Sequence, residues 1–239
     1  MTRIPGSLIN SHLITLDIEN HRYILTEDPE VEFISCTTLV SWFFSEFDAL
    51  KIATRLTSSH PKYKHRTPES LMSEWEEARN EGTLTHKEIE EYITKGKKPV
   101  MPKSKSGIEW LNKNINLSGE VYPELIVFSE ELGIAGTVDL LVYNEITGKF
   151  DIYDWKTNKS IDEEAWGGKC GTKPPTYDLP DCNFYHYSLQ LSLYKYLLEN
   201  YHDVKIGRLY LLHLKQNRVV TYECAYLKET VLDILDYGY

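Results

Sequence analysis

The stretch Gly133–Lys156, which reads GIAGTVDLLVYNEITGKFDIYDWK, decides the fold of this 239-residue chain. Two runs within it, 134–143 and 149–155, are rich in valine, isoleucine, leucine and tyrosine, the residues that favour β-strands. The Glu-Ile-Thr-Gly between them is typical of the loop of a β-hairpin. The stretch therefore predicts two antiparallel strands joined by a short loop.

The loop also predicts which residues of the two strands lie side by side. If Asn144 pairs with Lys149, then Asp139 lies opposite Asp154, with the two Cβ atoms about 5 Å apart on one face of the sheet. Lys156 follows on the same face, because strand side chains repeat every two residues. The hairpin is therefore expected to bring two carboxylates and one ammonium together.

The carboxylate pair predicts a metal site. Two carboxylates this close repel each other, and burial in apolar strands penalises their charge, so a divalent cation would resolve both problems. Aspartate oxygens and water suit Mg²⁺ or Mn²⁺. Lys156 could then steady the attacking water and the charge that develops on a phosphate. The alternative is that Asp139, Asp154 and Lys156 face solvent on an amphipathic hairpin. Apolar residues that predict burial on both faces argue against it: Leu140, Leu141, Val142, Ile152 and Trp155.

The same residues carry a family resemblance. Asp139 followed by Asp154-Trp155-Lys156 resembles the D…(D/E)-X-K signature of the PD-(D/E)XK nuclease superfamily. Gly136–Asp139 followed by Asp154–Thr157 resembles its RecB-like exonuclease branch. The resemblance implies that Asp139 and Asp154 bind the metal and act in catalysis together with Lys156.

A histidine upstream of the hairpin belongs to a second motif. His86 and Ile89 fall on one face of a predicted helix, where a histidine is by default a core residue. However, residues 81–90, EGTLTHKEIE, resemble the G-T-x-x-H-x-x-I-E motif of the RecB-like branch. The resemblance implies that His86 is a metal ligand. Glu90, one turn further on, is expected to orient it.

Two glutamates near the hairpin each have two alternative roles. Residues 121–129 are a predicted strand that enters the hairpin, and this strand contains Glu124. Glu124 and the following Glu130 are either further metal or water ligands or simply carboxylates at a strand edge. Neither is placed in the predicted catalytic set.

A third motif lies on the helix predicted over 183–199. By periodicity alone, Tyr194 belongs to the apolar stripe of this helix. Gln190 to Tyr194, however, resembles the Q-x-x-x-Y motif of the RecB-like branch, which implies that Gln190 and Tyr194 contact nucleic acid beside the metal. Together with the Gly-Thr and Asp-Trp-Lys-Thr segments, this motif resembles the corresponding sequence of mitochondrial genome-maintenance exonucleases.

The remaining patterns predict a single α/β domain over 1–239. Short strands over 13–18, 22–25 and 31–35 are expected to cap the core within residues 1–60, and Thr37-Thr38 is expected to cap the helix that follows.

Further along, the patterns predict helices and strands in the order of a nuclease core. A helix beginning after Thr67 is expected to break at Gly82, and a second helix should cover 83–94. The order helix, hairpin strands, helix, strand matches the α-β-β-β-α-β core of the superfamily. The predicted fold class is therefore a PD-(D/E)XK, restriction-endonuclease-like core, with a central mixed β-sheet flanked by helices.

Composition limits the partners of the protein. The net charge of −10 argues against coating of nucleic acid by charge alone, although a local basic strip can still guide a strand. The long irregular segment over 160–180 also carries lysines and aromatics that could contact phosphates and bases. The candidate cations are Lys62, Lys64, Arg66, the lysines of 95–105, Lys159, Lys169 and Lys173, and the candidate stacking residues are Trp166 and Tyr177. Each charge run is equally explained as a solvated face.

The cysteines and the apolar runs limit the class of protein further. The four cysteines are scattered, so no iron–sulfur cluster of the kind that some RecB-like relatives carry is expected. No run is long enough to span a membrane and the chain opens without a secretory signal, which predicts an intracellular protein with no membrane partner.

These features predict a Mg²⁺- or Mn²⁺-dependent deoxyribonuclease. The expected activity is that of a single-strand DNA exonuclease in replication, repair or recombination, with a helicase or polymerase as a possible protein partner. Two alternatives stay open. One is a structure-specific endonuclease, and the other is a catalytically silent nucleic-acid-binding or scaffolding relative.

Overall fold

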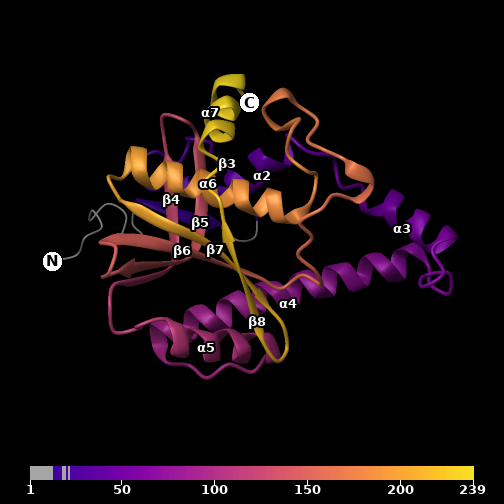
Figure 1. The fold of residues 1–239 in the computed structure, drawn as a ribbon, viewed down its shortest axis with the longest axis horizontal. Helices are drawn as coiled ribbons and strands as arrows, with labels where there is room; N and C mark the ends of the chain where they lie inside the picture. Colours follow the sequence, from indigo (N-terminus) through magenta and orange to yellow (C-terminus); the bar gives the residue numbers. More distant parts are fainter. Residues whose placement is uncertain (1–12, 18–19, 21) are drawn as a thin grey trace.

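A mixed six-stranded β-sheet forms the centre of the protein (Figure 1). The computed structural model describes residues 13–17, 20 and 22–239. The strands of the central sheet are β3 (Ile34–Ser35), β4 (Val121–Ser129), β5 (Ile134–Asn144), β6 (Lys149–Lys156), β7 (Ile206–Leu214) and β8 (Val219–Cys224). Their order is β3-β5-β6-β7-β8, and β4 pairs with β5. The β3–β5 and β6–β7 pairs are parallel and the others are antiparallel.

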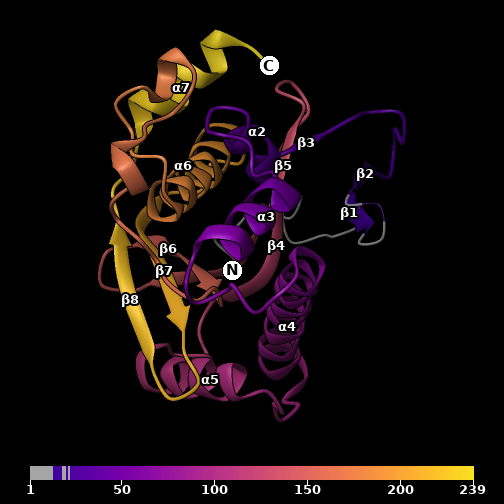
Figure 2. The same ribbon diagram turned by 90° about the vertical axis from the view of Figure 1, so that its right-hand side faces the viewer.

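Helices pack on both faces of this sheet, as the patterning predicted (Figure 2). They are α2 (Cys36–Ser41), α3 (Ala49–Ser59), α4 (Pro68–Lys95), α5 (Pro102–Asn114), α6 (Asn183–Tyr201) and α7 (Lys228–Tyr237). Residues of α4 and α5 form one apolar core with β5, β6 and β7. Residues of α2, α6 and α7 form a second core with the sheet. The predicted fold class and its α-β-β-β-α-β order are confirmed.

The register of the hairpin is the one that the four-residue loop predicts. Asn144 pairs with Lys149, and the ladder continues to Leu140 opposite Tyr153. Gly148 closes the loop with φ of 70°, a left-handed conformation that favours glycine. One further step along this register brings Asp139 opposite Asp154.

The predicted helix break at Gly82 is wrong. α4 runs unbroken from Pro68 to Lys95, with Thr67 as its N-cap and Gly96 in the left-handed conformation at its end. Gly82 lies in the middle of this helix, where glycine costs about 1 kcal/mol relative to alanine. Its role is close packing, because a Cβ at this position would lie 2.8 Å from Thr157 Oγ1.

The N-terminal segment differs from the predicted cap in two respects. β1 (Ile14–Asp17) and β2 (Arg22–Leu25) do form a separate antiparallel pair, while the predicted residues Ile18, Glu19 and His21 lie outside the described residues. β3 instead joins the central sheet beside β5. Ser35, and not Thr37 or Thr38, caps α2, because its hydroxyl accepts a hydrogen bond from Thr38 N at 3.0 Å.

The segment between β6 and α6 is long and largely irregular, as predicted. It contains the short 3₁₀ helices η1 (Trp166–Gly168) and η2 (Pro174–Thr176). Thr176 in η2 is buried, and its hydroxyl donates a hydrogen bond to Phe43 O at 2.8 Å. This hydrogen bond ties the segment to the residues that follow α2. No helix in the described ranges is long and apolar enough to cross a membrane.

Candidate active site

Three carboxylates lie in a row across three neighbouring strands. A second four-residue loop joins β4 to β5, so that Ser129 pairs with Ile134. Following this register sets Glu124 of β4 beside Asp139 of β5, and the register of the next hairpin sets Asp139 beside Asp154 of β6. The antiparallel arrangement therefore gathers acidic side chains that are far apart in the sequence.

Glu124 interrupts its strand with an unusual backbone conformation. Its φ is 48°, while Pro123 and Leu125 on either side keep their ladder partners Leu140 and Val138. A non-glycine residue with positive φ is uncommon, and such strain concentrates at functional sites. The kink breaks the regular alternation of side chains at Glu124, next to the partly buried Asp139. Burial and the charge of Asp139 raise the pKa of Glu124 to about 8.

α4 supplies a histidine to the same site. His86 Nδ1 lies 3.4 Å from Asp139 Oδ1. One ligand atom from each of His86, Glu124 and Asp139 lies within 4.8 Å of the others. Burial opposes protonation of His86, but the charge of Asp139 and the hydrogen bond with it outweigh this effect. Together with the charges of Glu124 and Asp154, they raise the pKa of His86 to about 9.

Asp139 is held between the helix and the hairpin. Its Oδ2 accepts a hydrogen bond of 2.7 Å from the backbone N–H of Trp155. Burial by itself raises the pKa of Asp139, but the charge of His86, the contacts with His86 and the charge of Lys156 reverse this effect and lower it. Asp139 is therefore ionised at neutral pH.

Asp154 pairs with Lys156 on the face of β6 that meets α6. Asp154 Oδ2 lies 2.7 Å from Lys156 Nζ, and both side chains are largely buried. Burial raises the pKa of Asp154 to about 6, and Asp139 adds to the shift while Lys156 opposes it. Burial alone would lower the pKa of Lys156, but the charges of Asp154 and Asp139 raise it. Lys156 is therefore an ammonium ion at neutral pH.

α6 completes the surroundings of this ammonium. Lys156 Nζ lies 3.5 Å from Gln190 Oε1 and 4.2 Å from the centre of the Tyr187 ring. Gln190 Nε2 donates a 2.7 Å hydrogen bond to Tyr194 Oη. Tyr194 is itself buried, and a Cβ at Gly136 would overlap its ring. The hydrogen bond to Tyr194 thus fixes the orientation of the Gln190 amide.

The structure brings together most of the residues that the sequence predicted for the site, with one different grouping. His86 and Asp139 meet, but among the described residues the group that could hold an ion includes Glu124 and not Asp154. Within that part of the chain, no hydrogen bond joins Glu90 to His86. Glu90 instead lies near enough to Glu124 for its charge to raise the pKa of that group.

The donors of this site fit a divalent cation. Glu124 and Asp139 offer oxygen atoms and His86 offers a nitrogen atom, and all three side chains are partly accessible to water. Carboxylate oxygens and water are the ligands of Mg²⁺ and Mn²⁺, whereas imidazole favours the transition metals. The pKa values of Glu124 and Asp154 are both raised, because burial and the charge of Asp139 oppose their ionisation. A bound cation would offset this repulsion.

Comparison with known proteins identifies the family of the chain. No curated protein matches the chain. The crystal structure of SSO0001 is similar with a TM-score of 0.39 and 15% sequence identity, over 87% of this chain and 77% of that one. A family model described as the PD-(D/E)XK nuclease superfamily matches residues 47–234, which include every residue of the site. The chain belongs to the PD-(D/E)XK nuclease superfamily.

Proposed function

We propose that the protein is a Mg²⁺- or Mn²⁺-dependent deoxyribonuclease of the RecB-like branch that degrades single-stranded DNA from an end. The single observation that carries the nuclease assignment is the meeting of His86, Glu124 and Asp139 beside the Asp154–Lys156 pair. The Gln190–Tyr194 pair against Lys156 supports the RecB-like branch, because its motif is part of that resemblance.

In this proposal His86, Asp139 and Asp154 hold the cation, as the sequence predicted, and Glu124 is added to them. The bound cation would polarise a phosphate oxygen and lower the pKa of a coordinated water molecule. Asp139 enters the site as a fixed anion because the Trp155 N–H and His86 both contact its carboxylate. Glu90 would act on Glu124 through its charge.

Lys156 would stabilise charge and orient water. Because its pKa is raised, it keeps its proton and does not serve as a general base at neutral pH. Its ammonium can donate three hydrogen bonds, and Asp154 and Gln190 hold it in position. An oriented cation in a partly dry site lowers the barrier mainly in the transition state. Tyr194 is a positioning residue in this scheme, because it is buried behind Gln190.

Two features support one domain that acts on a nucleic-acid strand. β3 from the N-terminal segment belongs to the same sheet as β5 and β6, so we propose one nuclease domain over 1–239. An open cavity lined by several cations lies beside the site. Residues 157–159, which directly follow Lys156 in the sequence, form part of its wall. We propose replication, repair or recombination as the setting of this activity, with a helicase or polymerase as the protein partner.

Cleavage of linear and circular DNA tests the proposal. With Mg²⁺ or Mn²⁺, end-labelled linear single strands should be degraded while closed single-stranded circles persist. Asp139→Asn, which keeps the shape of the side chain, should abolish cleavage of the linear strands. Equal cutting of linear and circular strands would identify an endonuclease instead. Linear strands left intact by the wild type, under conditions where it binds them, would identify a silent relative.

A further inference from the structure

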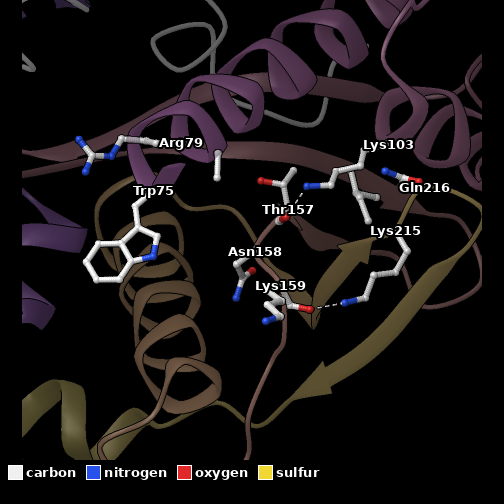
Figure 3. A pocket seen from close by; sticks show the side chains of 10 residues that line it. Trp75, Arg79, Lys103, Thr157, Asn158, Lys159, Lys215 and Gln216 are labelled. Carbon is white, nitrogen blue, oxygen red and sulfur yellow. Dashed lines mark hydrogen bonds between the residues drawn. The ribbon is translucent and has the colours of Figure 1, made fainter. Parts of the chain in front are cut away.

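A cavity of about 510 Å³ opens beside the end of β6 (Figure 3). Four segments surround it: part of α4, the start of α5, the residues that follow Lys156, and the β7–β8 turn. Its walls include Trp75, Arg79, Lys103, Thr157, Lys159 and Lys215. Because Thr157 directly follows Lys156, the cavity adjoins the candidate active site.

The cavity concentrates positive charge in a protein that is acidic. Arg79, Lys103, Lys159 and Lys215 line it, whereas the net charge of the chain is −10. No carboxylate lines it, and within the described part of the chain none of these four cations lies in an ion pair. A cluster of cations without counter-charges is a binding site for an anion.

Two of the lysines shape the wall and keep donors to spare. Lys103 Nζ donates to Thr157 O at 2.7 Å, and Lys215 Nζ donates to Lys159 O at 2.6 Å (Figure 3). Each ammonium has three N–H groups, so further donors remain for a ligand. These contacts fix the chain just after Lys156.

The charged forms of two cavity lysines, Lys159 and Lys215, are destabilised by their surroundings. The contact and charge of Lys62 lower the pKa of Lys159. Burial lowers the pKa of Lys215, and Arg218 and Lys103 add to this effect. A bound anion would offset the repulsion in both places.

One face of α4 connects the cavity to the active site. Trp75, Arg79, Gly82 and His86 follow one another at intervals of three or four residues, so they form a single stripe along the helix. His86 lies at the metal site and Gly82 packs on Thr157. At 1.5 Å per residue, Arg79 and Trp75 lie about 10 and 17 Å along the axis from His86. The stripe thus leads from the candidate metal ligand to the cavity.

We propose that this cavity binds the single nucleic-acid strand next to the point of cleavage, with its phosphates on Arg79, Lys103, Lys159 and Lys215 and a base stacked on Trp75. The inference rests on the proposed function and adds the residues that guide its substrate. Trp75 is half-buried and contacts exposed Phe47, with ring centres 5.8 Å apart, so an aromatic surface borders the cations. Cations beside aromatic side chains are the usual platform for single strands.

The charge of the cavity is tested with Arg79→Gln/Lys159→Gln. Among the described residues, neither of these two side chains donates to a backbone carbonyl or lies in an ion pair, so the fold should be unaffected. The matched control is Lys205→Gln/Lys228→Gln, which removes the same charge from exposed positions outside the cavity. Binding of labelled oligo-dT is measured by fluorescence anisotropy in EDTA at several salt concentrations.

The cavity variant should bind at least about 10-fold more weakly than the control at low salt. Its dependence of log affinity on log salt should flatten by about 1.4, since each lost phosphate contact in a single strand contributes about 0.7. If the cavity and control variants bind alike, the inference is wrong. If inorganic phosphate displaces the strand as well as a competing oligonucleotide does, the cavity is a small-anion site and the inference is also wrong.

Stacking is tested separately with Trp75→Ala, Trp75→Phe and an abasic strand. Loss of one stacked base is worth about 1–3 kcal/mol, so Trp75→Ala should weaken oligo-dT binding by about 5- to 150-fold. Trp75→Phe should retain most of the affinity. The abasic strand, which offers phosphates alone, should bind equally to wild type and Trp75→Ala. An equal loss for both strands would contradict the stacking role.

Binding in EDTA separates this inference from the proposed function. If the wild type cleaves no DNA with either cation, yet its strand binding depends on the cavity, the proposed function fails and the inference holds. If the wild type cleaves DNA but the cavity variant binds as the control does, the inference fails and the proposed function holds.

Discussion

At the scale of single residues, the neighbours of Lys156 fix the position of its charged ammonium group. Asp154 at 2.7 Å and Gln190 at 3.5 Å hold the ammonium on the face of β6 that also carries Asp154. The Tyr187 ring covers it from α6. An ammonium held in this way is the arrangement that stabilises developing charge efficiently.

Replacing Lys156 should therefore affect the rate and not the binding. We expect Lys156→Ala to lower single-turnover cleavage by about 10²-fold or more, while affinity for a single strand in Ca²⁺ changes by only a few-fold. Lys156→Arg should rescue poorly, because the planar guanidinium does not fit the place of a compact ammonium. Single-turnover rates at saturating enzyme, beside a binding titration, check both. An unchanged rate for Lys156→Ala would exclude the catalytic role.

Gly136 and Tyr194 form a second test at this scale. A methyl group at Gly136 would overlap the Tyr194 ring and lie 3.1 Å from Cys36 Sγ. Overpacking of this kind costs about 1–3 kcal/mol, so Gly136→Ala should lower the free energy of unfolding by that amount. It should also displace Tyr194 and release Gln190.

Tyr194→Phe is the control for this pair, because it removes only the hydroxyl that accepts from Gln190. We expect it to lower the cleavage rate by several-fold with little effect on stability. Urea unfolding and single-turnover cleavage distinguish the two variants. A Tyr194→Phe protein with wild-type cleavage would show that the Gln190 contact has no influence on the chemistry.

At the scale of elements, the packing of α4 against the end of β6 depends on one absent side chain. A Cβ on Gly82 would lie 2.8 Å from Thr157 Oγ1, and His86 is one turn away. Gly82→Ala should therefore gain helix propensity of about 1 kcal/mol yet displace Thr157 and the adjacent Lys156. We expect stability to change little while cleavage falls.

Thr157→Ala removes the atom that Gly82→Ala would meet. The Gly82→Ala/Thr157→Ala double variant should therefore recover cleavage toward the level of Thr157→Ala alone and should be more stable than Gly82→Ala. A double-mutant cycle on the free energy of unfolding and on the cleavage rate measures this coupling. Additive effects would mean that the contact does not decide how α4 approaches the strand.

The same elements show what the sequence could predict. The β5–β6 register followed from the length of the loop, because a short loop leaves few ways to pair the strands. The same reasoning applied to Glu130–Gly133 would have paired Ser129 with Ile134 and placed Glu124 beside Asp139. The length of this loop is therefore a signal in the sequence that points to Glu124.

Other features had no readable local signal. Gly82 in a helix of 28 residues is indistinguishable from a helix break without knowledge of its neighbour Thr157, which is distant in sequence. β3 has only two residues, and it joins the sheet because β5 extends beyond β6 at that end. The left-handed conformation of Glu124 likewise depends on tertiary contacts and not on its own preference.

At the scale of the whole molecule, the active site makes stability depend on pH. The folded-state pKa is about 9 for His86, about 8 for Glu124 and about 6 for Asp154, against 6.5, 4.5 and 3.8 for the ordinary groups. All three are raised, so these groups bind more protons in the folded protein than in the unfolded chain. The stability that this provides is complete below the ordinary pKa values and is lost as pH rises through the folded values.

We therefore expect the metal-free protein to unfold more easily as pH rises from about 5 to about 9. The affinity for divalent cations should increase as pH rises, because the three groups lose their protons. Urea unfolding in EDTA across this range, repeated with Mn²⁺, measures both effects. His86→Gln should flatten the upper part of the metal-free curve, between about pH 6.5 and 9. A metal-free protein that gains stability over this range would contradict the assigned protonation.

The row of carboxylates across β4, β5 and β6 has a consequence for how this chain can vary. Glu124, Asp139 and Asp154 meet only because the two turns between their strands have the lengths they do. Ile146 in the second turn is 96% exposed, so its identity is free to change. One inserted or deleted residue there, however, would turn Asp154 to the opposite face of the sheet. These surface turns should therefore drift in composition over evolution while their lengths stay fixed.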